Sequence, residues 1–585
     1  MDGARIRRNL PVFVILMVAL LLRASHLAWG LPALLHPDEH RYIGPATIIV
    51  ARGDLNPHYF QNPSVMIYLT SLLFWALTGP SHAFRALNDG LNLGIPDPRG
   101  DFLDMVVLRG TVAVAGTAMV AITYLAGKEL LGRRAALFGA CLLAVSFLAV
   151  RDSHYATNDI LATTFLALSL LFATRIYTRG RTSDYLLAGI FGGLGTSTKY
   201  NVGVFAVALL AAHLARMSRA QGGSPCPVGA EAERGPRRHP ELIRQPRRHQ
   251  DTKSLHLSNF VPSCLRGGLR DGPLLLGGLA SLVAFLAGTP YALLDHRGFL
   301  EDFQGQFGYG AQTWQGQDSV PSALAFLAAL IQGYGLLPLA LAGVGIAFGL
   351  RGDRWKLALL CSIPVTYYLY MSTQRLFFVR FAIPMLPSLA LLSGYAIERL
   401  GDRWKLSPWR RTLPAVVLMV ALAQPLAYTL RHDAVLGQAD TRLLATAWID
   451  AHIPRDGSLA MESYAQLDAK FGWKGHGVQN TWVYWPEREE ALTTALSGRY
   501  EYVVVSSFGS ELWRKPGEPA SSLPAKYRPL ERNGRLLATF GPGIGGAEIP
   551  YSLDDMYTPF WHLFDRERPG PTIRIYQMST PESKP

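Results

Sequence analysis

Two adjacent carboxylates, Asp38 and Glu39, are the residues of this chain best placed to do chemistry. They follow a long apolar segment and have a histidine on either side, His36 and His40. A carboxylate beside a hydroxyl can take its proton as the oxygen attacks. Asp38 is therefore a candidate general base, and Glu39 a residue that positions it or orients the hydroxyl. An aspartate that only caps the next helix would give the same pattern, so the pair needs support from elsewhere.

Further polar residues stand at the ends of other apolar segments. Asp159, the third candidate catalytic residue, begins one of them, Lys199 lies in a turn between two others, and Arg375 and Arg380 precede a fourth. The ordinary alternatives are a helix cap, a lysine that reaches the membrane interface and arginines anchored on lipid headgroups. The candidate substrate-binding residues are His36, Arg41, Tyr42, His154, Lys199, Asn201, Arg375 and Arg380.

Carboxylates combined with Lys and Arg suit the transfer of a sugar from a polyprenyl phosphate. The acceptor hydroxyl needs one carboxylate as base, whereas the leaving phosphate is already a stable anion and needs no acid. Lysine and arginine would hold that phosphate and stabilise its developing charge. Glycoside hydrolysis, by contrast, requires two carboxylates in defined roles.

Composition indicates that these residues are positioned by membrane helices. Of 585 residues 49% are hydrophobic and 17% are charged, whereas soluble proteins carry about 25% charged residues. This excludes collagens, coiled coils and disordered tails, and the four cysteines show no disulfide or metal spacing. The net charge of +13 does not indicate nucleic-acid binding, because the basic residues are scattered over short loops. Orientation of membrane spans explains that scatter better.

The apolar segments predict a polytopic α-helical membrane protein with about eleven spans, each of roughly 20 residues. The predicted spans are 10–31, 106–127, 135–150, 159–174, 184–198, 200–215, 273–293, 322–349, 357–371, 379–397 and 412–430. They make residues 1–432 a transmembrane domain in the inner (plasma) membrane.

The distribution of Lys and Arg predicts which loops face the cytoplasm. Basic clusters fall on the same side as the N-terminus only if the apolar stretch 63–77 does not cross the membrane. We therefore expect 63–77 to be an interfacial helix within a first outer loop, 32–105. The polar segment 216–272 is expected to be a disordered cytoplasmic loop. Residues 433–585 then lie outside, where a helical pattern and four strand patterns predict a small α/β domain.

The chain also resembles the C-type membrane glycosyltransferases, in particular bacterial protein O-mannosyltransferases and the lipid A aminoarabinose transferase. The resemblance rests on an apolar span followed by His36-Pro37-Asp38-Glu39-His40-Arg41-Tyr42, on Asp159, on Lys199 and on 380–387, which reads RFAIPMLP. The resemblance implies the fold of the C-type glycosyltransferases and a polyprenyl-phosphate-linked sugar as donor. It also implies that Asp38, Glu39 and Asp159 belong to the site. One departure is Gln61-Asn62-Pro63-Ser64, where the family often has Lys-Pro-Pro-Leu.

Alternatives remain open at this point. Within the enzyme class the alternative is a polysaccharide polymerase or ligase, and outside it a transporter or a non-catalytic anchoring subunit. The expected partners are the lipid-linked sugar, the bilayer and an acceptor that is a protein, a lipid or a polysaccharide, with no nucleic acid. We expect no cofactor. The alternative is a divalent metal held by His36, Asp38, Glu39 and His40, with His154 or Asp159 as a further ligand.

Overall fold

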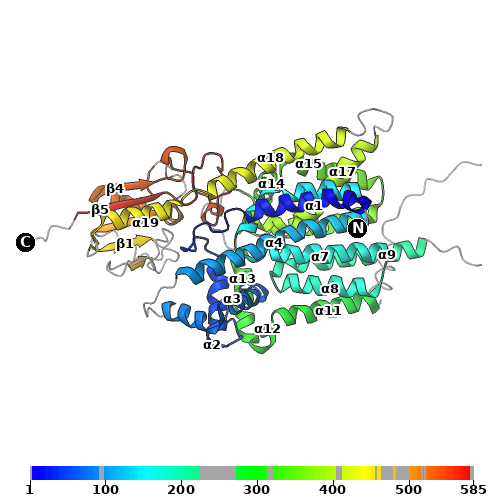
Figure 1. The fold of residues 1–585 in the computed structure, drawn as a ribbon, viewed down its shortest axis with the longest axis horizontal. Coiled ribbons are helices and arrows are strands. Elements are labelled where there is room, and N and C mark those ends of the chain that lie inside the picture. Colours follow the sequence, from blue (N-terminus) through cyan, green and yellow to red (C-terminus); the bar gives the residue numbers. More distant parts are fainter. Residues whose placement is uncertain are drawn as a thin grey trace, which may run out of the picture.

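The chain folds into a long bundle of helices with a five-stranded sheet at one end (Figure 1). The computed structural model describes residues 3–90, 98–222, 272–311, 320–403, 412–454, 457–462, 479–481, 500–515, 518 and 522–579. Most of the predicted loop 216–272 lies outside these residues.

The principal helices are α1 Gly3–Ala24, α2 His40–Arg52, α3 Val65–Gly90, α4 Pro98–Leu130, α5 Arg133–Ala144, α6 Phe147–Arg151, α7 Asn158–Thr178, α8 Thr182–Thr196, α9 Phe205–Gly222, α11 Gly272–Gly288, α12 Tyr291–Leu294, α13 His296–Ala311, α14 Ser322–Gly333, α15 Leu336–Leu350, α16 Arg354–Ser372, α17 Leu386–Arg403, α18 Thr412–Leu436 and α19 Thr441–His452. Short 3₁₀ helices that matter for the site are η1 Asp152–His154, η2 Tyr200–Val204, η4 Val379–Met385 and η12 Asp554–Met556. The predicted first loop, 32–105, therefore holds α2 and α3 and ends inside α4.

Each predicted span overlaps a helix. Within the described residues, five helices are long and apolar enough to cross a membrane, or seven if two bent pairs each count as one span. The expected count of about eleven stays a prediction. The segment 322–349, predicted as one span, consists of two helices, because α14 and α15 meet at 110°. The break falls at Gly335, whose φ of 113° favours glycine.

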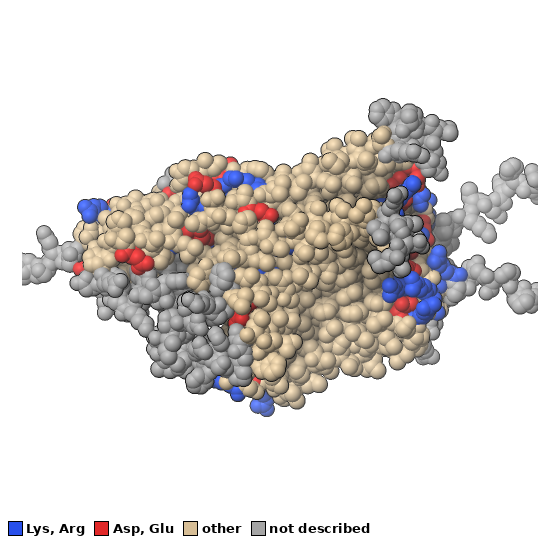
Figure 2. All heavy atoms as spheres, in the orientation of Figure 1, with Lys and Arg blue, Asp and Glu red and all other residues tan. Residues whose placement is uncertain are grey.

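The bundle has two different ends. α2, α3, α12 and α13 gather at the end that carries the sheet, and the N-terminus lies at the other end (Figure 1). In the view of Figure 2, Lys and Arg gather at the N-terminal end, and the middle of the molecule is a broad face almost without charged side chains. Such a face, flanked by charge, is what a membrane-embedded bundle needs.

The sheet has the strand order β2-β1-β3-β5-β4. Its strands are β1 Leu459–Glu462, β2 Gln479–Thr481, β3 Tyr502–Ser506, β4 Gly534–Phe540 and β5 Ile573–Met578. β1 runs parallel to β2 and β3, whereas β5 runs antiparallel to β3 and β4. Four of the strands and the helix α19 match the sequence prediction. The short polar strand β2 does not.

Between β4 and β5 the chain leaves the sheet and returns to the helix bundle. We call residues 551–563 the returning segment. The guanidinium of Arg151 donates to the carbonyl of Thr558 at 2.9 Å, and the backbone N–H of Val379 donates to Asp554 at 2.9 Å. The ring of Phe560 stacks on Phe147 with centroids 5.2 Å apart. These contacts tie the C-terminal part of the chain to α6 and η4.

Candidate functional site

Asp38 lies between α1 and α2, at the bundle end nearest the sheet, and its side chain is only 12% exposed. Arg380 contacts one carboxylate oxygen, Nη2 to Oδ2, at 2.8 Å. Arg41 contacts the other, Nε to Oδ1, at 3.1 Å. The backbone N–H of Asp38 donates to Nδ1 of His36 at 3.2 Å. A carboxylate that only caps α2 would be solvated and free of two guanidinium groups, so capping does not account for this environment.

Arg380 links Asp38 to a second carboxylate. It belongs to η4, and its Nε lies 4.0 Å from Oδ2 of Asp159. Its guanidinium carbon lies 4.7 Å from the ring centre of Phe378 and 4.3 Å from that of Tyr557. Two aromatic faces therefore fix this cation between the two carboxylates.

Asp159 stands in the first turn of α7 and forms an ion pair with Lys199. Lys199 precedes η2, and its ammonium lies 5.0 Å from the ring centre of Phe381. Lys199, Arg380 and Arg41 thus surround two carboxylates, Asp38 and Asp159, with three cations. We call these five residues the charge cluster. Its excess of positive charge suits an anionic ligand.

The electrostatics of the cluster keep Asp38 ionised. Burial raises the pKa of this carboxyl, but the guanidinium groups of Arg380 and Arg41 outweigh burial and bring the pKa below its usual value. Asp38 therefore carries its negative charge at neutral pH and can accept a proton. Removal of a neighbouring cation would make it a stronger base.

The carboxylate of Glu39 accepts hydrogen bonds from other parts of the protein. Its side chain is fully buried, and Arg109 of α4 donates to both carboxylate oxygens at 2.8 and 2.7 Å. The backbone N–H of Ala156 also donates to Oε1, at 2.8 Å. Arg109 further donates to the carbonyls of Leu27 and Trp29. This geometry favours the positioning role predicted for Glu39, because it holds the loop that carries Asp38.

His36 and Tyr42 surround Asp38 rather than extend the charge cluster. The ring of His36 lies 4.8 Å from that of Tyr155 and 5.8 Å from that of Tyr557. Burial lowers the pKa of His36 to about 4, so its imidazole is neutral at neutral pH. Tyr42 is 3% exposed and belongs to the hydrophobic core.

Of the remaining predicted residues, Asn201 lies near the site, whereas Arg375 and His154 lie away from the charge cluster. Asn201 lies two residues after Lys199 and donates to the hydroxyl of Tyr367 at 2.5 Å. Arg375 is exposed, and its guanidinium forms no ion pair with any described residue. His154 contacts Asp433 and not the charge cluster. The structure therefore separates Arg375 and His154 from the other predicted binding residues.

Two of the residues considered as metal ligands in the first loop, Glu39 and His40, have other partners in the structure. Arg109 occupies both oxygens of Glu39, and Nε2 of His40 lies 3.1 Å from the carbonyl of Leu34. Among the described residues the side chains that gather as a metal-ligand set are His154, His432 and Asp433. His154 is thus not a partner of the first loop.

Comparisons with known proteins concern the fold and one segment of the sequence. Residues 101–225 match the family model described as dolichyl-phosphate-mannose-protein mannosyltransferase. ArnT from Cupriavidus metallidurans, solved with undecaprenyl phosphate bound, superposes with a TM-score of 0.53 at 17% identity, covering 97% of each chain. The chain has the fold of the C-type glycosyltransferases. The archaeal oligosaccharyltransferase AglB from Archaeoglobus fulgidus, solved with an inhibitory peptide and a dolichol-phosphate, gives a TM-score of 0.52 at 11% identity, covering 98% of this chain and 89% of that one. No curated protein matches the chain by sequence.

The C-type glycosyltransferase fold and the apolar helices together make this chain a multi-pass membrane protein. The segment matched by the family model, 101–225, contains Arg109, Asp159 and Lys199. The resemblance stated from the sequence is confirmed by the model match and the superpositions. Asp38 and Arg380 lie outside the matched segment, and their place in the site rests on the geometry above.

Three residues that support the site were missed by sequence reasoning: Arg109 holds Glu39, Tyr557 covers Arg380, and Arg151 holds the returning segment. Arg109 and Arg151 both stand in or beside apolar segments, and a charged residue inside a membrane span needs a partner, which was the available signal. Tyr557 stands in a segment without regular periodicity. It reaches Arg380 only because the returning segment folds back onto the helix bundle.

Proposed function

We propose that this protein is a glycosyltransferase that moves a sugar from a polyprenyl-phosphate donor to an acceptor hydroxyl. The observation that carries the proposal is the charge cluster, in which Asp38 is held beside Arg380, Arg380 in turn faces Asp159, and Asp159 pairs with Lys199. The structures of ArnT and AglB that share the fold contain undecaprenyl phosphate and dolichol-phosphate respectively, which supports a lipid-linked donor.

In the proposed reaction Asp38 acts as the general base. The acceptor O–H gives its proton to a carboxylate oxygen of Asp38 while the acceptor oxygen bonds to the anomeric carbon. The bond from that carbon to the phosphate oxygen breaks, and the phosphate leaves as an anion. Attack from the face opposite the phosphate inverts the anomeric configuration. The charge of the phosphate is met by Lys199 and Arg380, so the step requires no metal.

Donor binding would also activate the base. Arg380 contacts Asp38, and a phosphate that also binds this guanidinium would weaken its hold on the carboxylate. The pKa of Asp38 then rises from its lowered value, and proton transfer from the acceptor becomes more favourable. Binding of the donor and readiness of the base are thereby coupled through one side chain.

The proposed site faces the outer side of the inner membrane. The charge cluster lies at the end of the bundle opposite the N-terminus, and basic residues gather at the N-terminal end (Figure 2). Basic residues favour the cytoplasmic side, which supports a cytoplasmic N-terminus and an outer sheet. The acceptor proposed is a protein, lipid or polysaccharide hydroxyl presented at that outer face.

The direct test is to follow the lipid product. Purified protein is incubated in detergent with polyprenyl-phosphate sugars extracted from membranes, with and without envelope acceptors, and the lipids are analysed by mass spectrometry. We expect free polyprenyl phosphate to accumulate in step with glycosylated acceptor. A transporter would leave the lipid-linked sugars chemically unchanged, and that result would overturn the proposal.

Substitutions at Arg380 and Lys199 should weaken donor use. A charge-assisted hydrogen bond is worth roughly 1.5–3 kcal/mol, so Arg380→Lys and Lys199→Ala should each lower kcat/KM for the donor by about ten- to a hundredfold. Lysine cannot replace the two parallel hydrogen bonds of arginine to phosphate. Arg375→Lys is the matched control, because Arg375 is exposed and outside the charge cluster. Equal kinetics in all three variants would contradict a phosphate clamp.

Tyr557 should matter through its ring and not through its hydroxyl. A cation–π contact is worth about 0.5–2 kcal/mol, so Tyr557→Ala should raise the KM for the donor by roughly two- to thirtyfold. Tyr557→Phe keeps the face that covers Arg380 and should behave like the unmodified protein. Steady-state kinetics with varied donor separate the two variants. A loss in the Phe variant as large as in the Ala variant would instead assign the role to the hydroxyl.

A further inference from the structure

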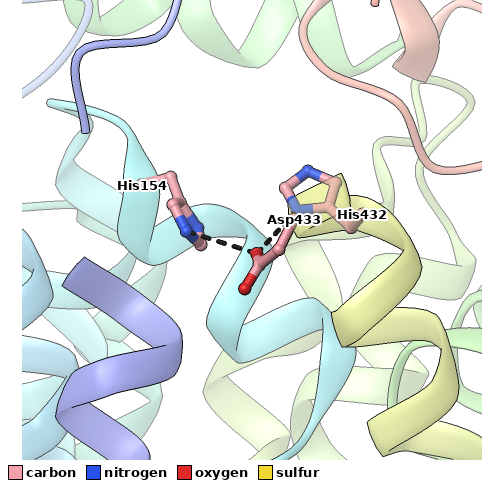
Figure 3. Close-up of side chains that lie close together, drawn as sticks. All are labelled: His154, His432 and Asp433. Atoms are coloured by element: carbon pink, nitrogen blue, oxygen red, sulfur yellow. Dashed lines mark ion pairs between the residues drawn. The ribbon is translucent and has the colours of Figure 1, made fainter. Parts of the chain in front are cut away.

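His154, His432 and Asp433 form a second polar cluster (Figure 3). His154 ends η1, and the other two residues lie near the C-terminal end of α18. The Asp433 carboxylate lies between the rings, with its Oδ1 3.5 Å from Nε2 of His154 and 3.7 Å from Nδ1 of His432. The mechanism proposed above uses none of these groups.

The cluster holds polar atoms without protein partners. Neither ring nitrogen of His432 has a hydrogen-bond partner among the described residues, although the side chain is fully buried. Oδ1 of Asp433 also has no hydrogen-bond partner there. Its carboxylate is only 13% exposed, and no described Lys or Arg forms an ion pair with it. A buried carboxylate in this position requires a cation.

His154 presents a nitrogen that is ready to bind such a cation. Its Nδ1 lies 2.9 Å from the carbonyl of Val150, which fixes Nδ1 as the protonated nitrogen and leaves a lone pair on Nε2. Ser25 Oγ lies 3.1 Å from Nε2 and 3.0 Å from Oδ2 of Asp433. A hydroxyl has one proton, so it cannot donate to both groups. A histidine oriented by a backbone carbonyl is the usual arrangement of a metal ligand.

The geometry points to a divalent metal site. The three ligand atoms lie within 4.8 Å of one another. Ligands bound to Zn²⁺ at roughly 2.0–2.1 Å in a tetrahedron are about 3.3 Å apart, close to the two shorter separations here. We propose that His154, His432 and Asp433 bind a transition-metal ion of the zinc type, because two imidazoles and a carboxylate favour such an ion over Mg²⁺ or Ca²⁺.

This ion would have a structural role next to the charge cluster. It would join η1 to α18, and Ser25, the residue after α1, contacts two of its ligands. Tyr155 follows His154 directly, and its ring packs against that of His36, two residues before Asp38. The ion therefore fixes the backbone on which one wall of the site is built, without contact with the reacting atoms.

Metal content tests the proposal directly. The full-length protein is produced without a polyhistidine tag, stripped with chelator, equilibrated with buffered ZnCl₂, desalted and analysed by mass spectrometry for metal. We expect about one tightly bound zinc ion per chain, and a melting temperature that rises with zinc. His432→Ala and Asp433→Asn should lose the ion. His213→Gln is the matched control, because this buried histidine of α9 contacts the hydroxyl of Tyr185 and lies outside the cluster.

Cobalt keeps the test decisive if the variants do not fold. Co²⁺ added to the stripped, unmodified protein should give the visible absorption of a tetrahedral site with nitrogen and oxygen ligands, and Zn²⁺ should displace it. A protein that takes up neither ion would overturn the site and leave a proton on His154 as the cation that faces Asp433. Undiminished zinc binding in folded His432→Ala and Asp433→Asn would also overturn it.

Discussion

Replacing Asp38 by asparagine is expected to lower sugar transfer by about 10²–10⁴-fold, the usual contribution of a general base. Asparagine has nearly the same shape, but it keeps only one oxygen, which can accept from Arg380 or from Arg41, and its amide group turns a donor toward the other guanidinium. We expect this to cost some stability while the protein still folds and inserts. The loss should appear in kcat. The KM for the donor should not rise, because the variant site has one negative charge fewer to compete with phosphate.

Asp54→Asn is the control for this experiment, since Asp54 is an exposed carboxylate nearby in sequence whose partner is His58 at 2.9 Å. The pH profile gives a second readout. Because Arg380 and Arg41 lower the pKa of Asp38 against the effect of burial, the ionised base persists below the usual carboxyl range. kcat/KM reports the free protein and should fall only as pH drops through that lowered pKa, whereas kcat should fall at a higher pH because bound donor raises the pKa of Asp38. Near-normal transfer by Asp38→Asn would remove Asp38 from the mechanism.

Glu39→Gln should lower the stability of the protein, and not only its catalytic activity. Glu39 and Arg109 are both fully buried, and loss of one partner of such a pair typically costs about 3–5 kcal/mol because the other charge stays uncompensated. Glutamine also turns a donor toward Arg109 in place of an acceptor. We expect a large fall in the melting temperature in detergent, with poor insertion as the extreme result.

The control for Glu39 is Glu129→Gln, which removes a partner of Arg179 from a much more exposed ion pair. Such surface pairs are worth about 0–1 kcal/mol, so the melting temperature should hardly change. Burial raises the pKa of Glu39, but Arg109 outweighs it and lowers the pKa. The stabilisation is therefore present at neutral pH and is lost as pH falls through the lowered pKa. A stable, inactive Glu39→Gln variant would instead place Glu39 in the chemistry.

The sequence predicted the polar residues of the charge cluster because each interrupts or directly follows an apolar segment. Asp38, Asp159, Lys199 and Arg380 all stand out for that reason, and the structure brings them together. Arg375 has the same signal, yet it lies outside the cluster because only one of two arginines five residues apart lies in η4. Sequence position alone does not distinguish them.

The sequence did not predict one strand, one bend between helices, or the contacts between residues far apart in the chain. The strands β1, β3, β4 and β5 were predicted from apolar and β-branched residues, whereas β2 consists of Gln479, Asn480 and Thr481 and has no such pattern. The bend between α14 and α15 was missed because both halves are apolar throughout. His432 and Asp433 end an apolar segment like many polar residues, and only the packing of α18 on η1 gives them His154 as a neighbour.

The returning segment has a consequence for how the protein is made. Arg151 is bonded to carbonyls 407 and 408 positions further along the chain, and Tyr557 covers Arg380. Contacts between residues so distant in sequence form late, because a long loop must close before they are gained. During synthesis the helices are inserted well before residues 554–560 exist, so Arg380 lacks the ring of Tyr557 and Arg151 lacks its carbonyl partners until these residues have been made and packed. A nascent or truncated chain can therefore occupy the membrane while the surroundings of the charge cluster are unfinished, and we expect the proposed activity to begin only after the last contacts close.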